Sequence, residues 1–306
     1  MTLLLGIDCG GTNTKLLLAR EADGEWTTLR RDRFPTPQHP QALSEVVARV
    51  TDFVGPDAPD AFGFAVPGII DETGGVVACS NVRWLEGTTP TDTLSAALGA
   101  PGVVVHDGAA TARAEVVLGA ARGYTDIFVL GLGTGISGAH VIDGEIRRGA
   151  HGAAGEIGHV SLGGDRPCSC GQRGCLETFV GGTQLGQRWS AVTGAAAGSA
   201  TARDLIEAAG AGDTRAVAIL DEATTALARS VLDLVALVDP SVIVVGGGVA
   251  QAWAQVLEPT IAKARAAATF HHVPLIVPAR LGMWGAAWGT VLAARSGAGL
   301  EPSPAA

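Results

Sequence analysis

The chain has few cysteines, few charged residues and no long apolar run. It has 306 residues, of which five are cysteines and 17% are charged, and its 30 Asp and Glu outnumber its 21 Lys and Arg. Because no apolar stretch approaches the ~20 residues that cross a bilayer, no membrane span is predicted. The formal net charge of −9 leaves no basic stripe for phosphates, so nucleic acid is not an expected partner. The first residues, MTLLLGIDCGG, lack the features of a signal peptide. We therefore expect a cytoplasmic protein, in which stable disulfides are rare.

Apolar runs alternate with segments of helical periodicity along the chain. This alternation predicts an α/β protein. Strand, glycine-rich turn and second strand follow one another twice, which suggests two related lobes with a cleft between them. We predict a small N-terminal lobe over 1–115, a large lobe over 116–285 with a metal loop at 159–175, a last helix over about 286–296 that packs back on the first lobe, and a flexible tail over 297–306.

Three glycine-rich turns each follow an apolar strand. Glycines let backbone N–H groups approach phosphate oxygens closely, so we interpret the turns as a nucleotide site, although one such turn alone is usually a plain hairpin. In the first, Asp8 at the strand end would hold Mg²⁺ through water; in the third, a flat base could lie on bare backbone. The predicted contacts are Asp8, Gly10, Gly11, Thr12 and Lys15 in the first turn, Gly131, Gly133, Thr134 and Gly135 in the second, and Gly246, Gly247 and Gly248 in the third.

Asp107 ends the apolar strand GVVVH and begins a helical segment. An aspartate in this place commonly caps the helix that follows. It could also act as a general base that takes a proton from a substrate hydroxyl during phosphoryl transfer. The two roles are compatible, because one carboxylate oxygen can cap while the other faces substrate.

Three of the five cysteines lie within eight residues of one another. Cys168, Cys170 and Cys175 follow His159 closely, and three thiolates with one imidazole suit tetrahedral Zn²⁺. Four protein ligands fill the coordination of the metal, so the predicted role is structural. Glu156 precedes His159 by three residues and Glu177 follows Cys175 by two, so a metal would also fix two carboxylates able to accept hydrogen bonds from sugar hydroxyls. Without a metal, both glutamates would be ordinary surface charges.

These motifs together resemble the ROK family of sugar kinases over nearly the whole chain. The resemblance is strongest at the Glu-x-x-His followed by the three-cysteine run. The matching segments are DCGGTNTK (8–15), VPGIID (66–71), SNVRW (80–84), HDGAATARAE (106–115), GLGTGISG (131–138), GEIGH (155–159), CSCGQRGCLE (168–177) and VVGGGV (244–249).

The resemblance implies the two-lobed actin-like ATPase (ribonuclease H-like) fold with an inter-lobe cleft. It implies transfer of the γ-phosphate of ATP, with Mg²⁺, to the primary hydroxyl of a hexose, typically glucose. It places the catalytic base at Asp107. Sugar contacts are implied at Asn81, Glu156, His159 and Glu177, with His159 ligating zinc through one ring nitrogen and reaching sugar with the other.

Two residues beside Asp107 depart from the family pattern. The family has Asn immediately before the catalytic Asp and again two residues after it, whereas this chain has His106 and Ala109. His106 replaces a sugar contact by a side chain of different shape and charge, unless it makes only structural hydrogen bonds. N-acetylmannosamine, N-acetylglucosamine, mannose or a sugar-like cyclitol is therefore an alternative acceptor.

Two other functions fit the same motifs less well. The family includes sugar-responsive transcriptional regulators with a DNA-binding segment ahead of the kinase-like part, and this acidic chain starts at the first strand. A sugar-binding protein without catalysis would have no need of phosphate turns. The resemblance also suggests a homodimer or homotetramer.

Overall fold

The computed structural model describes residues 1–79 and 81–299. The described residues divide into two compact units. Unit 1 comprises the described residues of Met1–Val117, Gly149–Ala153 and those from Trp284 onward, and unit 2 comprises Leu118–Arg148 and Ala154–Met283. Of the predicted tail, residues 300–306 lie outside the described part of the chain. Among the described residues no helix is both long enough and apolar enough to pass through a bilayer.

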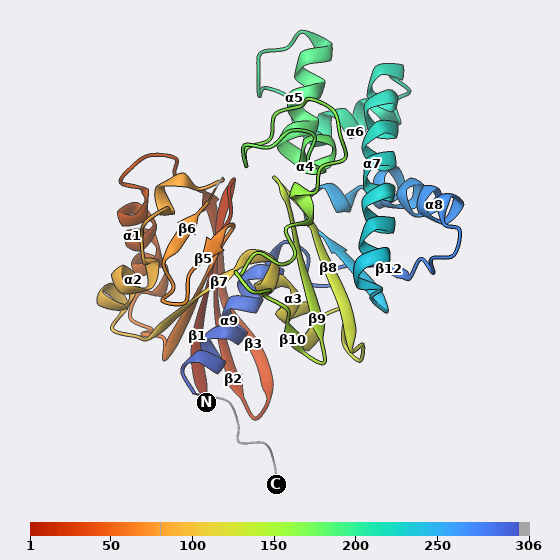
Figure 1. Ribbon diagram of the computed structural model, residues 1–306. Helices are drawn as coiled ribbons and strands as arrows, with labels where there is room; N and C mark the ends of the chain where they lie inside the picture. The colour runs from red at the N-terminus through yellow and green to blue at the C-terminus, as the bar shows by residue number, and fades with distance from the viewer. Residues whose placement is uncertain (80, 300–306) are drawn as a thin grey trace. The chain divides into compact units, whose positions relative to one another are not determined.

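Unit 1 is built on a five-stranded sheet with the strand order β3-β2-β1-β4-β7 (Figure 1). Its strands are β1 (Thr2–Cys9), β2 (Asn13–Ala22), β3 (Glu25–Pro35), β4 (Ala61–Val66) and β7 (Gly102–His106). β1 pairs with β2 as an antiparallel hairpin and with β4 in parallel, and β4 pairs with β7 in parallel. The predicted hairpin around the first glycine turn is thus confirmed. Asp107 lies where the edge strand β7 ends.

Four α-helices belong to the described part of unit 1. They are α1 (Ala42–Val54), α2 (Pro90–Leu98), α3 (Asp107–Val117) and α9 (Gly285–Gly297). α1 buries Val46, Val50 and Val54 at every fourth residue, in the same core as Phe62 and Phe64 of β4. This spacing is one face of an α-helix. A short two-stranded sheet of β5 (Ile69–Ile70) and β6 (Val76–Ala78) follows β4.

The last helix of the chain packs closely on the sheet and on α3. Gly289 of α9 lies so near α3 that an added Cβ would overlap the carbonyl oxygen of Ala110, one turn after Asp107. Gly6 of β1 and Gly63 of β4 similarly have no room for a side chain against Ala287 and Thr290 of α9. These three glycines allow backbone-to-backbone packing that any side chain would prevent.

We expect Gly289→Ala to lower the free energy of unfolding by about 1–3 kcal/mol, because overpacking outweighs the gain in helix propensity of about 1 kcal/mol. Urea denaturation measures this change. Gly210→Ala is the matched control, since nothing lies within 4 Å of a Cβ at this position near the end of α6. A Gly289→Ala protein as stable as the control would show that α9 and α3 separate without cost.

Unit 2 contains a second five-stranded sheet, with the order β10-β9-β8-β11-β12. The strands are β8 (Asp126–Leu132), β9 (Ile136–Ile142), β10 (Glu145–Ile146), β11 (Val242–Gly246) and β12 (Leu275–Pro278). β8 and β9 form the antiparallel hairpin that carries the second glycine turn, and β11 pairs with β8 in parallel. The second and third glycine turns therefore both extend from the same end of neighbouring strands.

Five α-helices complete the described part of unit 2. They are α4 (Glu177–Val180), α5 (Gly182–Thr193), α6 (Ala202–Gly210), α7 (Thr214–Val238) and α8 (Glu258–Ala267). α7 begins at the N-cap Asp213, whose carboxylate accepts from the backbone N–H groups of Arg215 and Ala216. Its buried face, including Leu220, Leu227 and Leu234, belongs to the core of this unit.

Candidate active site and metal centre

The metal loop, residues 159–175, is a small irregular hairpin in unit 2. Its two sides are joined by the backbone hydrogen bonds Leu162 N–H to Gly174 O (2.8 Å) and Cys168 N–H to Gln172 O (2.9 Å). Four glycines of the hairpin adopt positive φ, namely Gly163, Gly164, Gly171 and Gly174. The tip of the hairpin thereby carries Cys168 and Cys170 back toward its base, where His159 and Cys175 lie.

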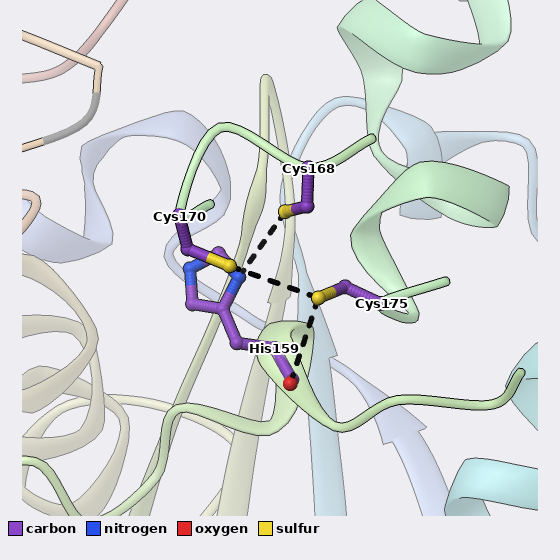
Figure 2. A group of neighbouring side chains, drawn as sticks. All are labelled: His159, Cys168, Cys170 and Cys175. Carbon is purple, nitrogen blue, oxygen red and sulfur yellow. Dashed lines mark hydrogen bonds between the residues drawn. The ribbon is translucent and has the colours of Figure 1, made fainter. Parts of the chain in front are cut away.

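The four predicted metal ligands converge on one point. Figure 2 shows the sulfur atoms of the three cysteines gathered around the ring of His159, and one ligand atom from each residue lies within 4.8 Å of the others. Cys168 Sγ is 3.5 Å from His159 Nδ1, and Cys170 Sγ is 3.7 Å from Cys175 Sγ. A tetrahedral zinc with Zn–S of about 2.3 Å and Zn–N of about 2.0–2.1 Å requires S···N of about 3.5 Å and S···S of about 3.8 Å. The spacing of the side chains fits this ion.

The surroundings of the cluster disfavour thiolates unless a cation is present. Burial raises the pKa of Cys175 to about 12, with further increases from the neighbouring Cys170 and Cys168. Burial likewise raises the pKa of Cys168. Converging thiols in this state are the donor set that a divalent cation deprotonates and holds.

His159 uses its two ring nitrogens differently. Nδ1 faces the cysteines, and Nε2 is 3.9 Å from a carboxylate oxygen of Glu156. The two residues lie on one short turn of 3₁₀-helix, in which His159 N–H donates to Glu156 O at 3.0 Å. One ring nitrogen thus faces the candidate metal site and the other faces Glu156, and the contact of His159 with sugar stays a prediction.

Glu177 is nearly buried, with 6% of its surface exposed. One carboxylate oxygen accepts from Ile136 N–H at 2.9 Å. The other lies 3.4 Å from the hydroxyl of Ser169 in the metal loop. The sequence pointed to Glu177 as a sugar contact, and its partners in the structure are protein groups. Its role toward sugar stays a prediction.

The first glycine turn lies between β1 and β2 in unit 1. Asp8 and Lys15 are directly opposite each other in this hairpin, and Lys15 Nζ donates to Asp8 Oδ2 at 2.6 Å. Both residues were predicted to bind the nucleotide or its metal, and here they bind each other. Oδ1 of Asp8 lies toward Gly10, 4.0 Å from the position of an added Cβ.

Asn81 lies beside the same turn. A Cβ on Gly11 would lie 3.1 Å from the Cβ of Asn81, so glycine is what lets the segment after β6 approach the turn. The first glycine turn is also held from the side of β3, where Thr36 Oγ1 donates to Gly10 O at 2.6 Å. Unit 1 thus brings a predicted sugar contact next to a predicted phosphate contact.

Asp107 is the first residue of α3. Its Oδ1 accepts from Gly108 N–H at 2.6 Å and lies 3.4 Å from His106 Nε2. Cys79 is a further neighbour that the sequence did not single out: burial raises its pKa to about 11, and the nearby charge of Asp107 adds to this increase. The carboxylate thus has one oxygen engaged at the start of the helix, beside the histidine that departs from the family pattern.

The second and third glycine turns pack against each other in unit 2. Gly247 has φ +94°, and a Cβ there would overlap the backbone of Leu132 at the edge of the second turn. On another side, Gly182 N–H donates to Gly133 O at 2.9 Å and Thr183 N–H to Thr134 O at 3.1 Å. Sequence reasoning missed Gly182 and Thr183, because no motif marks them and only the folded chain brings them to the turn.

Three comparisons relate the chain to known proteins. Residues 4–296 match the model of the ROK family. The chain is 33% identical over 266 residues to a glucokinase from Thermotoga maritima, with 81% of this chain and 83% of that protein covered. It is 32% identical over 278 residues to an N-acetylmannosamine kinase from Escherichia coli O1:K1, with 89% and 91% covered.

A solved structure is similar over almost the full length. It is a ROK family glucokinase from Streptomyces griseus in complex with glucose and AMPPNP, with a TM-score of 0.84, 27% identity, and coverage of 96% of this chain and 99% of that one. The expected two-lobed actin-like ATPase fold is confirmed. From its matching motifs, its fold and this coverage, the chain belongs to the ROK family.

Proposed function

We propose that the chain is an ATP-dependent sugar kinase that transfers the γ-phosphate to the primary hydroxyl of a hexose, with glucose as the first candidate. The observation that carries this proposal is the similarity, over 96% of the chain, to a glucokinase solved with glucose and an ATP analogue. The residues placed at the glycine turns, at Asp107 and in the metal loop supply the chemistry that such a reaction needs.

The glycine turns would bind the nucleotide. Backbone N–H groups around Gly10–Thr12 and Gly133–Gly135 would donate hydrogen bonds to phosphate oxygens. The flat base of the nucleotide would lie against the backbone of Gly247 and Gly248, where no side chain stands in the way. Mg²⁺ would neutralise charge that develops on the phosphates, and Asp8 is the carboxylate that would hold it through water. The ion pair with Lys15 holds the carboxylate of Asp8 beside the turn.

Asp107 would accept the proton of the attacking hydroxyl. The hydrogen bond from Gly108 N–H fixes one oxygen of its carboxylate. A base held in this way removes the proton as the hydroxyl oxygen forms its bond to phosphorus, and ADP leaves. Glu156 and Nε2 of His159 would bind other hydroxyls of the sugar, which orients the acceptor.

Zinc would serve as a structural ion held by His159, Cys168, Cys170 and Cys175. Their spacing fits a tetrahedral ion whose four positions are all filled by protein. Such an ion would activate no water. By binding Nδ1 it would fix the ring of His159 and leave Nε2 directed away from the metal. Elemental analysis of purified protein tests this assignment directly.

The function is tested by measuring ADP release against a panel of hexoses, N-acetylhexosamines and cyclitols. We expect the highest kcat/KM with glucose and a product phosphorylated at the primary hydroxyl. Sugar binding without ADP release from any acceptor would instead identify a binding protein.

N-acetylmannosamine is the second candidate acceptor, and the 32% identity to an N-acetylmannosamine kinase is the observation that favours it. His106 is the residue through which the choice of acceptor can be tested. It stands where the family has asparagine, and it contacts Asp107.

We expect His106→Asn to change the ratio of kcat/KM for glucose to that for N-acetylmannosamine about tenfold in favour of glucose, because a changed hydrogen-bonding group discriminates between acceptors. The two kcat/KM values measured on one preparation check this. His140→Asn is the matched control, since His140 pairs with Asp126 inside the β8–β9 hairpin of unit 2. An unchanged ratio would mean that His106 makes only structural hydrogen bonds.

A further inference from the structure

Glu177 connects two parts of unit 2 that are far apart in the sequence. Its Oε2 accepts from the N–H of Ile136, the first residue of β9, 41 positions earlier in the chain. Its Oε1 faces the metal loop, 3.4 Å from Ser169 Oγ and 4.0 Å from Cys168 Sγ. A carboxylate that is 6% exposed is costly to bury unless it is hydrogen-bonded. Protein groups therefore hold both carboxylate oxygens in place, Ile136 N–H for Oε2 and Ser169 Oγ for Oε1.

The residues after Glu177 continue the same connection. Gly181 N–H donates to Glu177 O at 2.8 Å. The next two residues, Gly182 and Thr183, donate to the carbonyl oxygens of Gly133 and Thr134. The segment 177–183 thus holds the second glycine turn and the start of β9 at three places, namely Gly133, Thr134 and Ile136.

Two glycines of this segment have no room for a side chain. A Cβ on Gly182 would lie 2.6 Å from Gly133 O, and a Cβ on Gly181 would lie 2.8 Å from Glu177 O. On the opposite side, Gly247 packs on Leu132 just before the turn. Close-packed interiors transmit strain, so a displacement of Glu177 would be passed on to the turn.

We propose that Glu177 is a positioning residue for the nucleotide: it couples the metal loop to the second glycine turn, so that order in the metal loop supports phosphate binding as well as sugar binding. This rests on the proposed function, in which residues 133–135 bind the phosphates of ATP. A residue that acted only as a sugar contact would change sugar affinity and leave nucleotide affinity alone. The two roles therefore differ in a measurable quantity.

The test compares the Kd of AMPPNP, by isothermal titration calorimetry without sugar, in wild type and in Glu177→Ala. We expect binding to weaken about tenfold, the size typical of losing a group that orients a ligand-binding residue. Zinc content is measured on the same samples, so that loss of the metal is separated from loss of the link. Glu177→Gln, which keeps an oxygen for Ile136 N–H at the same reach, should restore most of the affinity.

The matched control is Asp213→Ala. Asp213 is another carboxylate of unit 2 that accepts backbone N–H groups, at the N-terminus of α7. Losing this cap lowers the stability of the protein and should leave the Kd of AMPPNP unchanged. A zinc-loaded Glu177→Ala protein whose Kd stays within about twofold of wild type would overturn the proposal.

A second measurement needs no variant. Hydrogen exchange over residues 132–137 is followed in wild type before and after a chelator removes the metal. Faster exchange at Ile136 in the stripped protein supports the coupling, and unchanged exchange overturns it, even if Glu177→Ala fails to fold. If wild type binds no AMPPNP at all, the proposed function fails, while the exchange experiment still decides whether Glu177 couples the two segments.

Discussion

Asp107→Asn is expected to lower kcat by about 10²–10⁴-fold, the range that a general base contributes. Asparagine has the same shape, and its side-chain oxygen can still accept from Gly108 N–H, as Oδ1 does now at 2.6 Å. What it loses is the ability to take the proton of the attacking hydroxyl. Sugar affinity should therefore stay within about threefold of wild type, because proton transfer contributes nothing to the ground-state complex.

Steady-state ADP release gives kcat, and calorimetry with the sugar alone gives the Kd. Asp60→Asn is the control: it is the same substitution in unit 1, at a carboxylate that accepts from Leu3 N–H at 2.7 Å. It should keep the wild-type kcat. An Asp107→Asn enzyme with near-normal turnover would remove Asp107 from the role of base. Thermal unfolding of both variants shows whether a lost activity is a lost fold.

The sequence predicted best those elements whose residues are buried together. β1, β4 and α1 have apolar residues in the run or spacing expected of a buried strand or helix, so a short stretch of sequence is enough to predict their burial. β3 (Glu25–Pro35) has no such period, since its sequence EWTTLRRDRFP is mostly polar and only its pairing with β2 makes it a strand. The sequence of α5 (Gly182–Thr193) gives a weak signal for a related reason, because the helix starts at a glycine and carries few apolar residues.

The same distinction applies to the candidate site. The metal cluster could be predicted because all four ligands lie between residues 159 and 175, where sequence spacing limits the possible geometry. The hydrogen bond between Glu177 and Ile136 could not, since it spans 41 residues and involves a backbone N–H that no side-chain motif marks. The ion pair of Asp8 and Lys15 could have been predicted, because a hairpin around Gly10–Thr12 places these two residues opposite each other.

Cys170→Ser is expected to lower zinc content from about one ion per chain to a small fraction, because a hydroxyl is a poor substitute for a thiolate ligand. The KM for sugar should rise at least about tenfold, since His159 would no longer be fixed by a metal bond. The free energy of unfolding should also fall, because binding of a structural ion contributes to folding. Elemental analysis, steady-state kinetics and denaturation on the same preparation measure all three.

Cys170 is the ligand of choice for this test because it is exposed, while Cys168 and Cys175 are buried. Replacing it removes a ligand without leaving a cavity in the core. Cys9→Ser is the control for zinc content, since Cys9 is buried in unit 1 and lies outside the cluster. A Cys170→Ser protein without zinc but with the wild-type KM for sugar would show that the metal does not shape the sugar site. If KM rises while zinc stays bound, Cys170 acts on the sugar site by another route, and the assignment of Cys170 as a zinc ligand is wrong.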